Sequence, residues 1–187
     1  TVSGTSISFG TEVSFDGGHS EEMAVVYDPD TSQIIISYAA IGSGGKTILG
    51  TVSGTSITFG TGVQFTSTAP LGVSVDYDTV ANKFVNTYRD TSNSNYGTAV
   101  VGTVSGTSVS FGTPVVYESA NSGFNQVSYS AISGKMVVAY VDYGNSSRGT
   151  YAVGTVSGTS ITFDGEVVFE SAATDSFGAT YDSNAEE

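Results

Sequence analysis

Short stretches in which apolar and polar residues alternate run along the whole chain. In residues 56–59, Ile57 and Phe59 alternate with Ser56 and Thr58, and this period of two is typical of a half-buried β-strand. No segment carries apolar residues at helical spacing over ten residues, which excludes a helical solenoid. The pattern therefore predicts an all-β protein.

The alternating stretches recur as part of a longer repeat. The string TVSGTSISFG begins at Thr1 and returns with few changes at Thr51, Thr103 and Thr155, so the copies start 50, 52 and 52 residues apart. Tyrosines keep the same spacing, in two series at Tyr27, Tyr77, Tyr129 and Tyr181 and at Tyr38, Tyr88 and Tyr140. This periodicity predicts four copies of a unit of about fifty residues.

Each unit is predicted to contain four short strands, a to d. In the first complete unit, strand a covers residues 24–27, strand b residues 34–38 and strand c residues 48–52. Gly54 is the first of two central residues between strands c and d, as a type II′ hairpin turn requires. Glycine reaches the positive φ of that position without a Cβ clash. Strand d is expected to continue beyond residues 60–61 after a bulge or bend.

Four antiparallel strands in about fifty residues match the length of a β-propeller blade. The expected fold is one repeat array over residues 1–187, a β-propeller whose chain starts and ends in the middle of a blade. A β-sandwich is the main alternative but gives no reason for equal units, and a β-solenoid normally has shorter coils. Residues 1–23 supply strands c and d of a partial blade, complete blades cover residues 24–74, 75–125 and 126–177, and residues 178–187 start the next blade.

The incomplete units at the two ends of the chain allow more than one way of assembling the repeats. They could together form a fourth blade that lacks strand b, two chains could share a larger ring, or the array could continue beyond the given residues. An unpaired strand edge pairs readily with another chain. We therefore expect a fragment or an oligomer, with self-association.

Charge and composition narrow the range of partners. Eighteen acidic and five basic residues give a net charge of −13, and such a surface repels phosphate backbones, so nucleic-acid binding is not expected. Apolar runs are far shorter than a membrane span, so membrane insertion is not expected either. Cysteine is absent, which excludes disulfides and thiolate metal sites.

Comparison of the copies separates invariant from variable segments. Strands c and d and their turn barely change, whereas the b–c and d–a connections differ between copies. In an up-and-down unit these two connections leave the sheet at the same end, where loops on a rigid scaffold commonly carry binding residues. The alternative is that they are ordinary solvated loops. The candidate ligand-binding residues are Arg89, Asp90, Asn93, Asn95, Tyr96, Asn125, Asp142, Tyr143, Asn145 and Arg148.

These residue types suit carbohydrate, because amides and carboxylates bond to hydroxyls and a ring stacks on the apolar face of a sugar. No nucleophile elbow, phosphate loop or dinucleotide fingerprint occurs, and the carboxylates are not paired as a glycosidase requires. His19 beside Glu21 and Glu22 is more simply a solvated loop than a metal site. The Asp-Pro-Asp of residues 28–30 lacks the later ligands of an EF-hand and is predicted to be a turn. An enzyme, a cofactor and a metal site are therefore not expected.

The recurring GTVSGTSISFGTPVVF-like run and the Asn-Ser-Asn-Tyr-Gly-Thr-Ala stretch of residues 93–99 resemble repeat proteins of aquatic bacteriophages and bacteria, of the tail-fibre or surface structural type. The architecture is also similar to kelch-like and lectin-like propellers, whose signature motifs are missing here. The resemblance therefore implies no particular binding residue.

Together these observations predict a non-enzymatic binding or adhesion module, extracellular or on a virion, that binds a glycan or a cell-surface receptor. The alternative function is a purely structural repeat that assembles into an oligomer or fibre through its strand edges.

Overall fold

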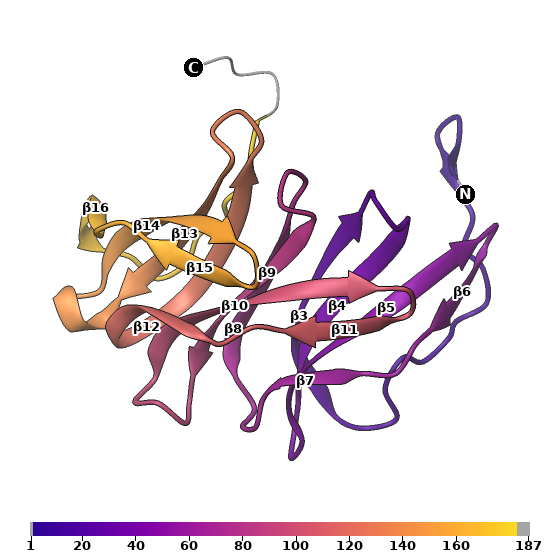
Figure 1. Ribbon diagram of the computed structural model, residues 1–187, viewed down its shortest axis with the longest axis horizontal. Coiled ribbons are helices and arrows are strands. Elements are labelled where there is room, and N and C mark those ends of the chain that lie inside the picture. Colours follow the sequence, from indigo (N-terminus) through magenta and orange to yellow (C-terminus); the bar gives the residue numbers. More distant parts are fainter. Residues whose placement is uncertain (1, 183–187) are drawn as a thin grey trace.

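The computed structural model describes residues 2–182 and is built from β-strands (Figure 1), so the all-β prediction is confirmed. The N-terminal hairpin consists of β1 (Val2–Ser3) and β2 (Ser6–Ile7). Repeat 1 contains β3 (Ser20–Asp28), β4 (Gln33–Ala40), β5 (Gly44–Ser53), β6 (Ser56–Phe59) and β7 (Val63–Thr66). Repeat 2 contains β8 (Leu71–Asp78), β9 (Lys83–Asp90), β10 (Tyr96–Ser105), β11 (Ser108–Phe111) and the first part of β12 (Val115–Ser130). Repeat 3 contains the rest of β12, β13 (Lys135–Asp142), the 3₁₀ turn η1 (Tyr143–Asn145), β14 (Arg148–Ser157), β15 (Ser160–Phe163) and β16 (Val167–Ala173).

Every repeat pairs its strands in the same antiparallel order. In repeat 1 the order is β3-β4-β5-β6, and β7 then pairs with the first half of β5, beside β6. Strand d is thus split in two at residues 60–62, and the predicted bend is confirmed. The second half of each strand c forms a tight hairpin with the first piece of strand d, as in the pair Ser53↔Ser56.

No helix within residues 2–182 is long and apolar enough to cross a membrane.

The c–d turns have the predicted geometry. Gly54 has φ +60°, while Thr55 is not among the residues with positive φ, as a type II′ turn requires. The equivalent glycines of the other copies, Gly4, Gly106 and Gly158, have φ values of +58° to +61°. The a–b turns are closed by a side chain instead, because Asp28 Oδ1 accepts hydrogen bonds from the backbone N–H groups of Asp30 (2.9 Å) and Thr31 (3.2 Å). The Asp-Pro-Asp segment is therefore a structural turn.

The prediction of a β-propeller with four-stranded blades, starting and ending in mid-blade, is wrong. Repeats 2 and 3 share one curled nine-stranded sheet, because β12 runs from the end of repeat 2 into repeat 3 as a single 16-residue strand. Repeat 1 forms a separate five-stranded sheet, and β1 and β2 form a two-stranded one. Residues 174–182 form no strand, so no fourth unit closes a ring within the described chain.

Proline explains why only one of these two connections is continuous. Pro70 lies between β7 and β8 and cannot donate a backbone hydrogen bond to a neighbouring strand. Ser122 occupies the equivalent position between repeats 2 and 3, and its N–H donates to the carbonyl oxygen of Asn95 at 3.1 Å. The strand therefore ends before repeat 2 but continues into repeat 3.

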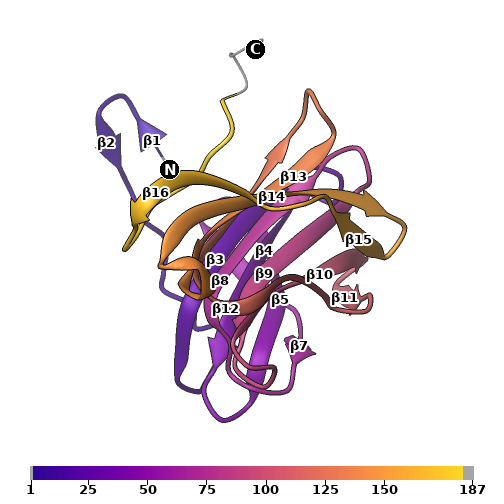
Figure 2. The same cartoon turned by 90° about the vertical axis from the view of Figure 1, so that its left-hand side faces the viewer.

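The first strands of the three repeats, β3, β8 and β12, lie side by side and bring the repeats into a row. Figure 1 shows this row from indigo at the N-terminal end to yellow, and Figure 2 looks at it from the side of repeat 3. Side chains replace backbone pairing between β8 and β12. Ser74 Oγ accepts from Val127 N at 3.1 Å, and Asp76 Oδ2 accepts from Tyr129 N at 2.7 Å.

Aromatic rings repeat the same contact at each junction between consecutive repeats. Phe65 of β7 packs on Tyr88 and Phe111 of repeat 2, with ring centroids 5.2 and 5.8 Å apart. Tyr117 packs in the same way on Tyr140 and Phe163 of repeat 3, at 5.3 and 5.4 Å. Each repeat thus buries its apolar face against the next one.

Candidate functional site

The variable loops lie at one end of the repeats, as predicted from their connections. Backbone hydrogen bonds join a d–a connection to a b–c loop at three places, Ile41 N to His19 O, Ser122 N to Asn95 O and Thr174 N to Ser147 O, at 2.8 to 3.1 Å. In each repeat the b–c loop and a d–a connection therefore lie side by side, and the candidate site is at this end of the repeats.

Each of the three adjacent a strands has a bulge at the same repeat position. The pairing register shifts between Glu21 and Ala24 in β3, and at equivalent places in β8 and β12. The residues inside the bulges, Glu22, Gly72 and Phe124, have φ of +53°, +59° and +52°. Glycine adopts this backbone conformation freely, but the conformation costs about 1–2 kcal/mol at Glu22 and at Phe124. Strained backbone of this kind is concentrated at functional sites.

The bulges are bonded to each other. Glu22 Oε2 accepts a hydrogen bond from the backbone N–H of Gly72 at 3.0 Å, and Asn125 Nδ2 donates to the carbonyl oxygen of Gly72 at 3.4 Å. The bulge of repeat 2 is therefore held from both sides, by repeat 1 and by repeat 3. A side chain at Gly72 would also be strained by its positive φ.

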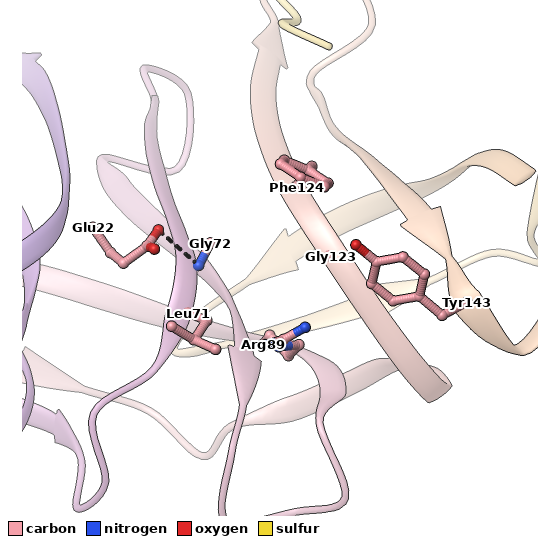
Figure 3. A pocket seen from close by; sticks show the side chains of 7 residues that line it. All are labelled: Glu22, Leu71, Gly72, Arg89, Gly123, Phe124 and Tyr143. Atoms are coloured by element: carbon pink, nitrogen blue, oxygen red, sulfur yellow. Dashed lines mark hydrogen bonds between the residues drawn. The ribbon is translucent and has the colours of Figure 1, made fainter. Parts of the chain in front are cut away.

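A pocket of about 170 Å³ opens between these bulges (Figure 3). Arg89 enters it from the end of β9, and Tyr143 from η1, which is capped by Asp142. A Cβ at Gly123 would lie 2.7 Å from the Tyr143 ring, so glycine is what lets the ring lie against β12. The pocket is lined by Glu22, Leu71, Gly72, Arg89, Gly123, Phe124 and Tyr143.

The lining combines aromatic faces with a few polar groups. Phe124 and Tyr143 are 46% and 38% exposed, so their rings remain accessible. Arg89 brings the one basic side chain of the lining to the pocket, and its Nε is buried without a hydrogen-bond partner among residues 2–182. Glu22 supplies a carboxylate. It is the only carboxylate of the lining.

Of the ten predicted ligand-binding residues, the structure places Arg89 and Tyr143 in this pocket, and Asn125 holds its floor through Gly72. The loop of repeat 2 uses several of the others for its own structure. Asp90 Oδ1 accepts from Ser92 N (2.9 Å) and Ser92 Oγ (2.6 Å), and the Asp90 carbonyl accepts from Asn93 N and Asn95 N. Tyr96 begins β10 and is half-buried.

The loop of repeat 3 is built in a similar way. Asp142 Oδ1 accepts from Asn145 N at 3.0 Å, and Asn145 Oδ1 accepts from Arg148 Nη1 at 3.1 Å. Asp142, Asn145 and Arg148 therefore shape the loop that carries Tyr143. His19, considered above as a metal ligand, has its Nε2 3.0 Å from Glu21 Oε1, and both side chains are exposed.

The sequence patterns did not indicate the pocket residues of the a strands, Glu22, Leu71, Gly72, Gly123 and Phe124. A usable signal was present, because positions 22, 72 and 124 are equivalent in the repeat and carry three unlike residues. The bulge itself could not be recognised, because a shift of pairing register leaves no fixed residue signature at these positions.

Comparison with known proteins gives no match: no family model, no curated protein and no solved structure is significantly similar to this chain. The geometry of the molecule is therefore the basis on which its function is inferred.

Proposed function

We propose that this chain is a non-enzymatic binding module that holds one saccharide unit in the pocket between its a-strand bulges. The observation that carries the proposal is the convergence of two accessible rings, Phe124 and Tyr143, with the basic side chain of Arg89 in one pocket. The apolar face of a sugar stacks on such rings, and its hydroxyls accept from arginine and donate to the Glu22 carboxylate.

The size and charge of the site favour this class of ligand. A volume of about 170 Å³ is below the range of about 300–1,000 Å³ of drug-sized pockets, so one sugar ring at the end of a glycan fits best. The net charge of −13 opposes binding of nucleic acid and other polyanions. A glycan- or receptor-binding role places the module outside the cell, on a fibre, a virion or a cell surface.

A glycan array probed with the full chain tests this proposal. Saccharide binding is expected, and Tyr143→Ala and Arg89→Ala should each weaken it roughly tenfold, the equivalent of one lost ring or charged contact. Tyr143→Phe should retain most of the binding because the ring remains. Asn93→Ala is the control, since Asn93 is exposed on the same surface but outside the pocket. Failure to bind any glycan, or equal binding by Tyr143→Ala and the unmodified chain, would exclude the proposal.

End-to-end assembly is a second candidate function, and one observation favours it. Met23, Val25 and Tyr27 of β3 are 57%, 60% and 52% exposed, whereas the equivalent Val73, Val75 and Tyr77 of β8 are 5–7% exposed because repeat 1 covers them. Repeat 3 of a second copy could cover β3 in the way that repeat 1 covers β8.

Asp164 opposes this contact at the C-terminal end of the array. Asp164 occupies the repeat position that is glycine in the earlier copies. In repeat 2 this residue is Gly112, and a Cβ there would overlap the carbonyl oxygen of Thr159 in the next repeat. If assembly reuses the junction geometry, Asp164→Gly should strengthen self-association in light scattering, and Tyr27→Ser should weaken it. A monomer at every concentration for both the unmodified chain and Asp164→Gly would exclude assembly as the function.

A further inference from the structure

Three carboxylates that do not line the binding pocket converge at the junction of repeats 2 and 3. Glu118 lies in β12, Asp142 at the end of β13, and Glu166 just before β16, and their oxygen atoms all lie within 4.8 Å of one another. Glu118 and Asp142 are only 4% and 5% exposed, while Glu166 is at the surface. Among the described residues, no ion pair with lysine or arginine engages any of the three.

Negative charges at this separation repel one another strongly when water is excluded. Burial raises the pKa of Glu118, and the charges of Asp142 and Glu166 add to that effect. One oxygen of Glu118 is satisfied, since Oε1 accepts from Ala120 N at 2.6 Å. The other, Oε2, is buried without a hydrogen-bond partner in the described chain.

A second, neutral group is directed at the same place. Tyr140 is 0% exposed, and its hydroxyl has no hydrogen-bond partner within residues 2–182. Glu118 lies beside this hydroxyl and interacts with it, and Glu166 and Asp142 are close enough to act on it electrostatically. Almost all buried polar atoms in proteins are hydrogen-bonded or bound to an ion. Glu118 Oε2, buried without a partner at hydrogen-bonding distance and close to two other carboxylates, therefore points to a ligand of positive charge.

We propose that Glu118, Asp142 and Glu166 bind one calcium ion, with the Tyr140 hydroxyl as a neutral neighbour. Calcium takes oxygen ligands at about 2.3–2.6 Å, so two ligands on opposite sides of one ion are about 4.6–5.2 Å apart, which matches the spread of these oxygens. Magnesium requires shorter distances and a near-ideal octahedron, which this irregular set does not offer. Glu166 lies at the rim, where water completes the coordination.

The site occurs once in the chain. Only at this junction does the repeat place acids at all three positions. The equivalent residues are Thr66, Asp90 and Pro114 at the junction before it, and Asp16, Ala40 and Gly62 at the one before that. Because Glu118 precedes the repeat boundary and Asp142 and Glu166 follow it, the ion would tie repeat 2 to repeat 3.

Equilibrium dialysis of the full chain against radioactive calcium chloride, after treatment with a chelator, tests the proposal. We expect one calcium ion per chain, with a dissociation constant of about 10⁻⁴–10⁻³ M as in extracellular calcium modules, and little competition from equimolar magnesium chloride. Calcium should also raise the midpoint of thermal unfolding. Glu166→Gln and Glu118→Gln should each weaken calcium binding roughly tenfold or more, because each removes a charged ligand.

Glu170→Gln is a matched control. Glu170 is the repeat equivalent of Glu118 and bonds to Ala172 N at 2.7 Å in the same way, but it is exposed and outside the cluster. Its calcium affinity should equal that of the unmodified chain. The proposal is overturned if calcium does not bind at ten times the upper end of the expected range, or if Glu166→Gln and Glu118→Gln bind it as well as Glu170→Gln does. Magnesium binding of equal strength would overturn the assignment to calcium.

Discussion

Gly112→Ala is expected to lower the free energy of unfolding by about 3 kcal/mol, the upper part of the range for overpacked sites. A Cβ at Gly112 would overlap the carbonyl oxygen of Thr159, which is in the c–d turn of the next repeat. The backbone conformation at this position does not require glycine. The N–H of Gly112 donates to the carbonyl oxygen of Val101, and the N–H of Asp164 donates to the equivalent carbonyl oxygen of Val153, both at 2.9 Å. The missing side chain is what lets one repeat approach the next.

Urea unfolding followed by circular dichroism measures this effect. Gly165→Ala is the control, since no atom lies within 4 Å of the added methyl group and φ is not positive there. That variant should change the free energy of unfolding by no more than about 0.5 kcal/mol. If both variants unfold at the same urea concentration, the Gly112–Thr159 contact does not hold the repeats together.

Tyr77→Ala is expected to destabilise the protein by about 3–5 kcal/mol, as for other large buried rings. Tyr77 is 5% exposed, packs in a cluster with Ile35, Leu49 and Phe84, and donates its hydroxyl to Asp30 Oδ2 at 2.7 Å. The change would remove both the packing and the hydrogen bond between repeats 1 and 2. Tyr77→Phe should lose only about 1 kcal/mol, the usual contribution of one hydrogen bond.

Tyr27→Ala makes the same chemical change at the equivalent position of repeat 1. Tyr27 is 52% exposed, so its loss should cost less than about 1 kcal/mol. Thermal and urea unfolding of the two alanine variants at low protein concentration would give the comparison. Similar destabilisation at both positions would show that the repeat junction is not what stabilises Tyr77.

Much of the local structure could be predicted from residue patterns. The four copies, the strands within each one and the type II′ turn at Gly54 depend on neighbouring residues, and all are present in the structure. The shared position of the variable loops followed from counting strands, and the hydrogen bond between Ser122 and Asn95 confirms it. Of the pocket, Arg89 and Tyr143 were predicted because they are on those loops.

The path between repeats could not be predicted in the same way. Equal units suggested separate blades around a closed ring, but Pro70 interrupts one connection and Ser122 continues the other, so two repeats merge into one sheet. The residue patterns also did not predict the bulges at Glu22 and Phe124 or the proximity of Glu118 to Asp142 and Glu166. Each depends on residues that are distant in sequence.

The repeat, its strands and its turns follow from the order of residues alone, because hydrophobic period and turn chemistry act over a few residues. How the repeats join, and which side chains meet between them, depends on packing in three dimensions. A junction is formed by surfaces about fifty residues apart in the chain, and small differences such as Gly112 against Asp164 decide whether two backbones can touch there.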